Sequence, residues 1–136
     1  MLISRVFYTE KIENAFRYTP IAVLIGARQV GKTSIMQCYV ENKTNLFLNG
    51  QDSEVAVLFE KLSIIEQYLQ ININAELDGL LLIDEFQYID GISTMLKLLT
   101  DKYAKLRILA SGSSSLDILQ KVEESLAGRV RIIEVQ

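Results

Sequence analysis

Histidine is absent from the 136-residue sequence, and cysteine and proline each occur only once. With a single cysteine, Cys38, the chain cannot form an internal disulfide, which agrees with a reducing, cytoplasmic environment. The usual nitrogen and sulfur ligands of a zinc site are also missing. No apolar run reaches the roughly 18 residues that a membrane-spanning helix needs. We therefore expect a cytoplasmic chain with no zinc site and no membrane span.

Neither sign of charge dominates, since 14 lysines and arginines stand against 17 acidic residues, for a net charge of −3. This balance gives no overall attraction to nucleic acid, so DNA binding would need a local basic patch. Hydrophobic residues make up 49% of the chain and charged residues 23%, which is a globular composition. We expect residues 1–136 to form a single domain.

The hydrophobic pattern switches repeatedly between the periods of strands and helices. Strands are expected at 21–25, 45–49, 80–84, 106–110 and 130–135. Helices are expected around 12–16, 35–40, 53–69, 92–103 and 114–126. Asp52 or Ser53 can cap the third of these helices, and Ser93 can cap the fourth. Strands that alternate with helices predict an α/β fold, with a parallel sheet covered on both faces.

The segment from Gly26 to Thr33 reads GARQVGKT and matches the complete P-loop pattern G-x-x-x-x-G-K-[ST]. Gly26 lets the chain leave the preceding strand through backbone angles that a side chain would forbid, and Gly31 lets the main chain approach phosphates closely. The loop amides and the following helix N-terminus form an anion site. We expect Lys32 to contact the β- and γ-phosphates of ATP, and Thr33 to ligate Mg²⁺. The expected nucleotide-binding residues are Gly26, Ala27, Arg28, Gln29, Val30, Gly31, Lys32, Thr33 and Ser34.

An acidic pair, Asp84 and Glu85, follows the apolar stretch 80–83. At the end of a buried strand beside the P-loop strand, Asp84 is placed to hold Mg²⁺, directly or through water. Glu85 would orient or deprotonate the attacking water. By itself the pair could equally be a solvated turn, but a complete P-loop in the same chain favours the magnesium and catalytic roles.

The motifs GARQVGKT, LLLIDEFQ, ILASGSSSL and SLAGRV, together with Arg5, resemble one group of prokaryotic AAA-type P-loop ATPase domains. The resemblance spans nearly the whole chain. It implies a three-layer fold with a five-stranded parallel sheet in the order 5-1-4-3-2, so that the strand at 106–110 lies between the two Walker strands. Domains of this group usually begin larger proteins, often followed by a nuclease-like domain of unknown function. The resemblance thus implies that this chain is the N-terminal part of a longer protein.

The same resemblance implies further catalytic residues. Counting along ILASGSS, Ser113 matches a polar sensor position and Ser111 is the next candidate, although these serines could instead turn the chain and cap the next helix. Arg129 matches an arginine that reaches a phosphate in its own subunit or in a neighbour's site, with a surface charge as the alternative. Gln87 could link the nucleotide state to a partner, or be a plain surface residue. The expected catalytic residues are Lys32, Glu85, Ser113 and Arg129.

These features predict an ATPase module whose nucleotide state drives a neighbouring domain or subunit. A small-molecule kinase is the first alternative, although the late arginines that could form its lid are few, namely Arg107, Arg129 and Arg131. A GTPase is disfavoured because Asp84 starts Asp-Glu-Phe-Gln rather than Asp-x-x-Gly. A regulatory module that holds nucleotide without turnover stays open, although the intact Glu85 argues against it.

AAA-type ATPases usually follow the fifth strand with a helical lid that covers the adenine. The sequence stops at Gln136, so we expect no lid in this chain and an open base site near residues 5–8. Weak discrimination between bases and slow turnover would follow. We also expect the strand at 130–135 to be an exposed edge that favours self-association into a homo-oligomer.

Overall fold

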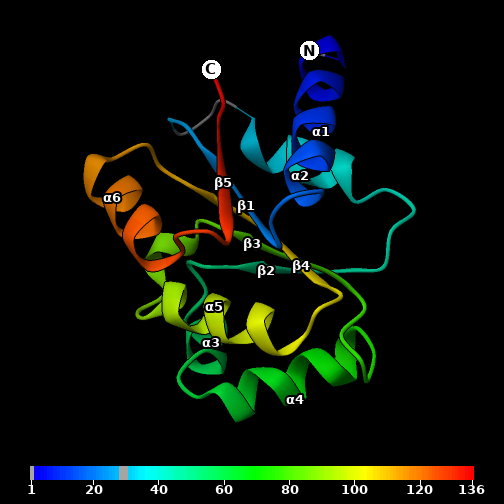
Figure 1. The fold of residues 1–136 in the computed structure, drawn as a ribbon, viewed down its shortest axis with the longest axis vertical. Coiled ribbons are helices and arrows are strands. Elements are labelled where there is room, and N and C mark those ends of the chain that lie inside the picture. Colours follow the sequence, from blue (N-terminus) through cyan, green and yellow to red (C-terminus); the bar gives the residue numbers. More distant parts are fainter. Residues whose placement is uncertain (1, 28–30) are drawn as a thin grey trace.

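The computed structural model of the chain describes residues 2–27 and 31–136 (Figure 1). Its strands are β1 (Ile21–Ile25), β2 (Asn45–Asn49), β3 (Gly79–Asp84), β4 (Leu106–Gly112) and β5 (Val130–Glu134). Its helices are α1 (Leu2–Phe16), α2 (Lys32–Tyr39), α3 (Ser53–Leu58), α4 (Leu62–Asn72), the 3₁₀ helix η1 (Phe86–Tyr88), α5 (Ile92–Lys102) and α6 (Leu116–Ser125). Within these described residues, no helix is both long enough and apolar enough to cross a bilayer.

All five strands form one parallel sheet in the order β2-β3-β4-β1-β5. This confirms the predicted order 5-1-4-3-2. β1 lies between β4 and β5, since its Ile21 pairs with Ile108 of β4 and with Val130 of β5. β4 lies between β1 and β3, although it follows both in the chain. Because the strands are parallel, their carboxyl ends meet at one edge of the sheet, which is where ligands bind in such folds.

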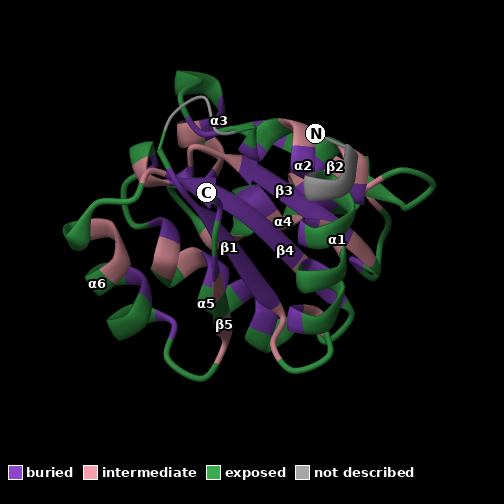
Figure 2. Cartoon of the chain, turned by 90° about the horizontal axis from the view of Figure 1, so that it is seen from above, coloured by how far each residue is buried: buried purple, intermediate pink, exposed green. Residues whose placement is uncertain are grey.

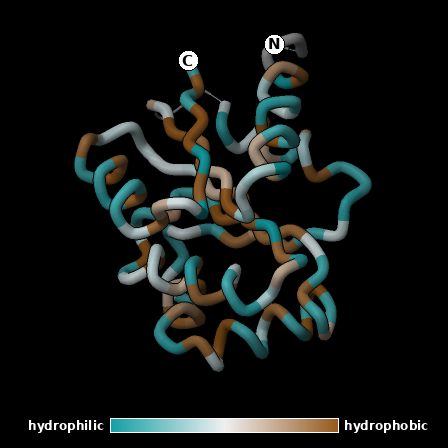
Figure 3. Tube along the Cα trace, viewed as in Figure 1, coloured by the Kyte–Doolittle hydropathy of each residue, from teal (hydrophilic) through white to brown (hydrophobic). Residues whose placement is uncertain are grey.

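Helices cover both faces of the sheet, and Figure 2 shows the buried strands between them. α1 and α2 pack on one face, against side chains that include Ala22, Leu24 and Leu82. α3, α4, α5 and α6 pack on the other face, where Val23 and Ile83 lie in the core. Both faces of the central strands are therefore apolar. Figure 3 shows hydrophobic residues along these strands. The chain has the predicted three-layer α/β architecture.

The predicted helix at 53–69 is divided into two helices in the structure. α3 ends at Leu58, Lys61 has the extended angles φ −139° and ψ 140°, and α4 begins at Leu62. No proline or glycine lies at this break. Instead, Phe59 turns into the core, where its side chain is only 2% exposed. The apolar spacing continues across the break, so periodicity alone could not locate it.

The helix caps follow the sequence signals in part. Asp52 caps α3, since its Oδ1 accepts a hydrogen bond from the Glu54 N–H at 2.9 Å. The prediction of Ser93 as a cap is wrong, because α5 already begins at Ile92, after Gly91 with φ 68°. A glycine with a positive φ turns the chain into the helix without a side-chain cap. Helix η1, directly after the acidic pair, was not predicted.

Candidate nucleotide-binding site

The ends of three neighbouring strands meet at the carboxyl edge of the sheet and carry most of the predicted site residues. Gly26 follows β1, Asp84 is the last residue of β3, and Gly112 is the last residue of β4. The Gly26 N–H donates to the Gly112 carbonyl at 3.3 Å, which joins β1 to β4 at this edge. β4 therefore lies between β1, which leads into the P-loop, and β3, which leads into the acidic pair.

Lys32 is the first residue of α2, and its side chain is buried at 5% exposure. The ammonium donates to the Gly26 carbonyl at 2.5 Å and to the Gly112 carbonyl at 2.8 Å. It also lies 3.9 Å from Oε1 of Glu85. These oxygens offset the cost of burying a positive charge. In the described part of the loop, the positive backbone angle belongs to Gly31, with φ 88° and open space where a Cβ would stand.

The Asp84 carboxylate is held between two hydroxyl groups from different elements. The Thr33 Oγ1 donates to Oδ2 of Asp84 at 2.9 Å. The hydroxyl of Ser111, which is fully buried in β4, donates to Oδ1 and accepts from the Glu85 N–H at 3.0 Å. Ser111 therefore joins the end of β3 to the end of β4 and fixes the orientation of the Asp84 carboxylate.

Glu85 turns the chain out of β3 with the left-handed angles φ 53° and ψ 54°. This conformation is unfavourable for a residue with a Cβ, and such strain tends to occur at functional sites. Its Oε2 accepts from the Gln87 Nε2 at 2.8 Å, while its Oε1 faces Lys32. The Gln87 Oε1 is buried and has no hydrogen-bond partner among the described residues. The Glu85 carboxylate is thus held on both oxygens in this structure.

Gly50, directly after β2, supports the acidic pair and was not among the predicted residues. Its N–H donates to the Asp84 carbonyl at 2.7 Å. A Cβ at this position would stand 2.2 Å from the Glu85 carbonyl oxygen, a backbone atom that cannot move aside. Only glycine therefore lets β2 approach the turn after β3 this closely. The sequence shows a glycine directly after a strand. Its contact with the acidic pair depends on the pairing of β2 with β3, which the sequence does not show.

The residues predicted to hold magnesium fit a hard divalent cation. Thr33 offers a hydroxyl oxygen and Asp84 a carboxylate oxygen, 2.9 Å apart on the same edge of the sheet. Mg²⁺ prefers such oxygen ligands and usually completes its shell with water and substrate phosphates. Within residues 2–27 and 31–136, no cluster of three or more acidic, histidine or cysteine residues could hold a metal by itself. A cation at Thr33 and Asp84 would therefore depend on bound phosphate.

Among the described residues, no hydrogen bond joins the Ser113 side chain to the acidic pair. Ser113 lies one residue beyond β4, where its carbonyl accepts from the Ser115 N–H at 3.0 Å. The hydroxyl that contacts Asp84 belongs to Ser111 instead. Residues two apart on a strand share a side, so counting along ILASGSS could not separate Ser111 from Ser113. The strand ends at Gly112, and its pairing with β3 sets Ser111 beside Asp84. Ser115 caps α6 by accepting from the Ile118 N–H at 3.2 Å.

Arg129 lies at the opposite edge of the sheet from the P-loop. Its carbonyl accepts from the Ile21 N–H at the start of β1. Its guanidinium donates to both oxygens of Asp101, at 2.8 and 3.0 Å. This pairing lowers the pKa of Asp101 and raises that of Arg129. A residue just before a parallel strand lies at the amino edge, so Arg129 is not brought together with Lys32 within this chain.

The remaining predicted residues are placed as follows. Ala27 is exposed, and Ser34 is half-buried in the first turn of α2. Residues 28–30 of the predicted nucleotide-binding set lie outside the described residues. In the segment 5–8, which was expected near the base, the Tyr8 ring is buried and its hydroxyl accepts from the Gln136 N–H at 3.1 Å.

Comparison with known proteins agrees with this geometry. The sequence profile of the AAA domain family matches residues 18–136, which include the P-loop, the acidic pair and all five strands. The chain belongs to the AAA domain family. This membership indicates that the AAA domain binds a nucleotide and is of the ATPase type.

Two curated relatives of this AAA domain are uncharacterized proteins of Mycobacterium bovis and Mycobacterium tuberculosis. Each is 29% identical over 136 residues. The alignments cover 99% of this chain but 29% of each relative. The chain therefore spans less than a third of the length of the curated relatives it matches.

Solved structures show the same fold at low sequence identity. A Walker-type ATPase of Pyrococcus abyssi superposes with a TM-score of 0.63 and 17% identity, covering 93% of this chain and 51% of that one. A DNA replication initiation factor superposes with a TM-score of 0.52 and 18% identity, covering 93% of this chain and 43% of that one. At these identities, the likeness establishes the fold of the AAA domain alone.

Proposed function

We propose that this AAA domain binds ATP with Mg²⁺ through residues 26–34 and hydrolyses it, as the motor or switch module of a larger ATPase. The observation that carries the proposal is the meeting of four side chains at one edge of the sheet. Thr33 lies 2.9 Å from Asp84, and Lys32 lies 3.9 Å from Glu85. An ammonium, a hydroxyl and two carboxylates are the groups that phosphate, a divalent cation and an attacking water require.

Phosphate binding is assigned to the P-loop backbone and to Lys32. The carbonyls of Gly26 and Gly112 hold the ammonium at the strand ends. A charge fixed in this way needs little reorganisation when phosphate oxygens replace one of the carbonyls. The open space above Gly31 leaves room for a phosphate group close to the main chain.

Thr33 and Asp84 are assigned to Mg²⁺. The Thr33 oxygen can ligate a cation through a lone pair while its hydroxyl keeps donating to Asp84, as it does in the structure. Ser111 holds the other carboxylate oxygen in place. When bound here, Mg²⁺ would neutralise charge on the β- and γ-phosphate oxygens.

Glu85 is assigned as the general base. As water oxygen bonds to the γ-phosphorus, the bond to the bridging oxygen breaks, ADP leaves, and the water proton passes to the Glu85 carboxylate. In the structure, Gln87 and Lys32 each face one oxygen of that carboxylate. Each of these oxygens has a second lone pair with which it can accept a hydrogen bond from the water.

A binding and turnover experiment tests the proposal. Calorimetry with Mg-ATP is compared between the wild type, Lys32→Ala and Lys61→Ala, an exposed lysine at the start of α4 that serves as the control. Lys32→Ala should weaken binding by at least about tenfold because it removes a charge-assisted contact, while Lys61→Ala should not.

Competition with GTP, CTP and UTP defines the base preference, and phosphate release is followed with and without DNA. Equal affinity of Lys32→Ala and wild type for Mg-ATP would sink the assignment.

A further inference from the structure

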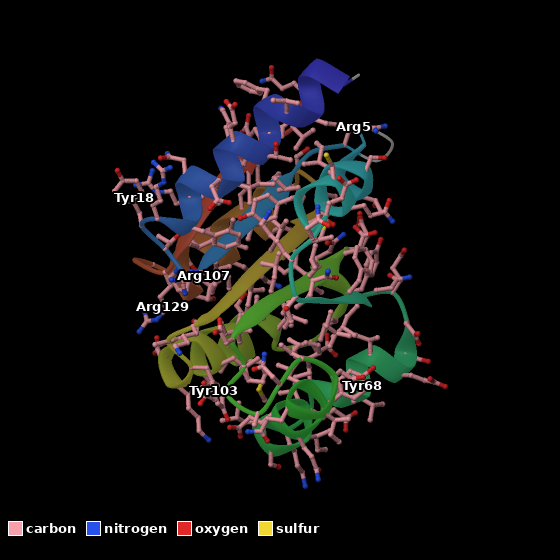
Figure 4. All side chains as sticks on the ribbon, turned by 90° about the vertical axis from the view of Figure 1, so that its right-hand side faces the viewer. Arg5, Tyr18, Tyr68, Tyr103, Arg107 and Arg129 are labelled. Carbon is pink, nitrogen blue, oxygen red and sulfur yellow. The ribbon has the colours of Figure 1, made fainter. Side chains whose placement is uncertain are left out.

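A cavity of about 510 Å³ lies at the amino edge of the sheet, opposite the nucleotide site. Phe16 and Tyr39, the last residues of α1 and α2, form part of its wall together with residues at the starts of β3 and β4 and in the loops before these strands. Figure 4 labels Arg107 on this side of the molecule, far from Arg5. The size is in the range of roughly 300–1,000 Å³ that small-molecule sites occupy. The proposed ATP reaction uses none of its lining residues.

The lining of the cavity is positively charged although the chain is not. Four cationic side chains, Arg17, Lys43, Lys105 and Arg107, face it together with two carboxylates, Glu13 and Asp78. The lining residues thus include two more positive than negative groups, in a chain whose net charge is −3. Of the four cations, Lys105 also lies 3.9 Å from the carboxylate of Glu76, outside the lining. Positive charge gathered in a concave site raises the local concentration of anions.

One of the two carboxylates is already engaged. The Tyr39 hydroxyl donates to Oε2 of Glu13 at 2.7 Å. Burial of the Tyr39 ring, and then this hydrogen bond and the charge of Glu13, raise the pKa of Tyr39 well above its ordinary range. Tyr39 therefore stays a neutral donor and keeps Glu13 in place. Lys43 donates to the Tyr39 carbonyl at 3.0 Å and lies 4.5 Å from the centre of its ring.

The two guanidinium groups are less engaged. Arg107 uses one nitrogen, Nη1, to donate to the carbonyls of Ala104 and Leu106, at 3.0 and 3.2 Å. These bonds hold the Arg107 group at the start of β4. No hydrogen bond or ion pair joins the Arg17 side chain to the part of the chain that the structure describes. Arginine presents five donors in a planar fork that matches phosphate oxygens.

We propose that this amino-edge cavity binds a small molecule that carries a phosphate group, held by Arg17 and Arg107. The excess of two positive charges matches a phosphate monoester, whose charge at neutral pH is about −1.5 to −2. The acidic balance of the whole chain repels a long polyanion, so a small phosphate ester fits the cavity better than a nucleic acid strand.

Nuclear magnetic resonance of the ¹⁵N-labelled chain tests this site directly. The nucleotide site is first saturated with Mg-ADP, and glycerol 3-phosphate, fructose 1,6-bisphosphate and inorganic phosphate are then titrated. The expected result is a saturable shift of the Arg17 and Arg107 side-chain signals with at least one probe. Arg17→Gln and Arg107→Gln should each weaken that binding by about tenfold or more, because each removes a charge-assisted contact.

Lys61→Gln is the matched control, since this exposed lysine lies at the start of α4, outside the cavity. Arg17 is exposed, and Arg17→Gln breaks no hydrogen bond or ion pair within the described residues, so it should fold like the wild type and give a clean measurement. The proposal is overturned if no phosphate probe shifts these signals, or if Arg17→Gln and Arg107→Gln bind the probe as the wild type does. Shifts that arise only with a single-stranded oligonucleotide would also overturn it, in favour of a nucleic-acid surface.

Discussion

Asp84 accepts one hydrogen bond on each carboxylate oxygen, from Thr33 in α2 and from Ser111 in β4. The P-loop pattern identifies Thr33, and the end of the apolar strand identifies Asp84. No such local pattern distinguishes Ser111 from Ser113. The pairing of Ile83 with Ala110 decides it, because this register sets Ser111 beside Asp84.

We expect Glu85→Gln to keep ATP affinity but to slow hydrolysis by about a hundredfold or more, since the amide keeps the shape and cannot accept the water proton. Affinity is measured by calorimetry and turnover by phosphate release on the same preparation. Hydrolysis at the wild-type rate would show that Glu85 is not the base.

We expect Ser111→Ala to lower the free energy of unfolding by about 1–2 kcal/mol, because it leaves the Glu85 N–H and one Asp84 oxygen without their partner. It should also weaken Mg-ATP binding. Ser113→Ala, the matched control, should change stability by less than about 0.5 kcal/mol. Urea unfolding measures both variants, and an equal effect at the two serines would contradict the role given to Ser111.

Among the elements, α3 and α4 show where local pattern and tertiary packing disagree. The apolar spacing predicts one helix across 53–69, yet burial of Phe59 separates two. Burying a phenylalanine side chain contributes about 1.5–3 kcal/mol. This exceeds what a few residues gain from staying helical, because helix propensities of ordinary residues differ by at most about 0.7 kcal/mol.

The cap of α3 provides a test at this scale. We expect Asp52→Ala to destabilise the protein by about 1 kcal/mol, because the Glu54 N–H loses its acceptor. Ser53→Ala is the control, since Ser53 lies inside α3 and its side chain does not cap it. Thermal or urea unfolding separates the two variants. A larger loss for Ser53→Ala would mean that the helix begins elsewhere.

Across the whole molecule, ion pairs connect the helices on one face to each other and to the sheet. Glu66 of α4 accepts from Lys102 at 2.5 Å and from the Tyr103 hydroxyl. Asp101 at the end of α5 accepts from Arg129, just before β5. The hydrogen bonds from Lys102 and then Tyr103 lower the pKa of Glu66, and those from Arg129 lower the pKa of Asp101.

These shifts predict how stability depends on pH. A carboxyl whose folded pKa lies below its unfolded value stabilises the fold above the unfolded pKa, about 4.3 for glutamate. That stability is lost as the pH falls through the folded pKa. We expect Glu66→Gln to unfold more easily than the wild type at neutral pH, with a difference that shrinks in acid. Urea unfolding across this range measures it.

Glu60→Gln is the control for this experiment. Glu60 is exposed, lies two residues before α4 begins, and makes no side-chain ion pair within the described residues. It should follow the wild-type profile at every pH. A Glu66→Gln difference that stays constant from neutral to acid pH would show that Glu66 acts through packing rather than through its charge.

The sequence by itself determined the five strands, their alternation with helices, and the positions of Lys32, Thr33, Asp84 and Glu85. These features depend on the period of apolar residues and on spacing within one loop, which are local properties. The order of the strands came from the resemblance of the motifs, and the structure confirmed it.

Only the tertiary structure decided which distant residues meet. Gly50 lies against the turn after β3, and Ser111 against Asp84, because of the order and register of β2, β3 and β4. Arg129 lies at the amino edge, paired with Asp101, because β5 runs parallel to β1 and begins there. Strand register and direction place such residues, and neither is a property of the local sequence.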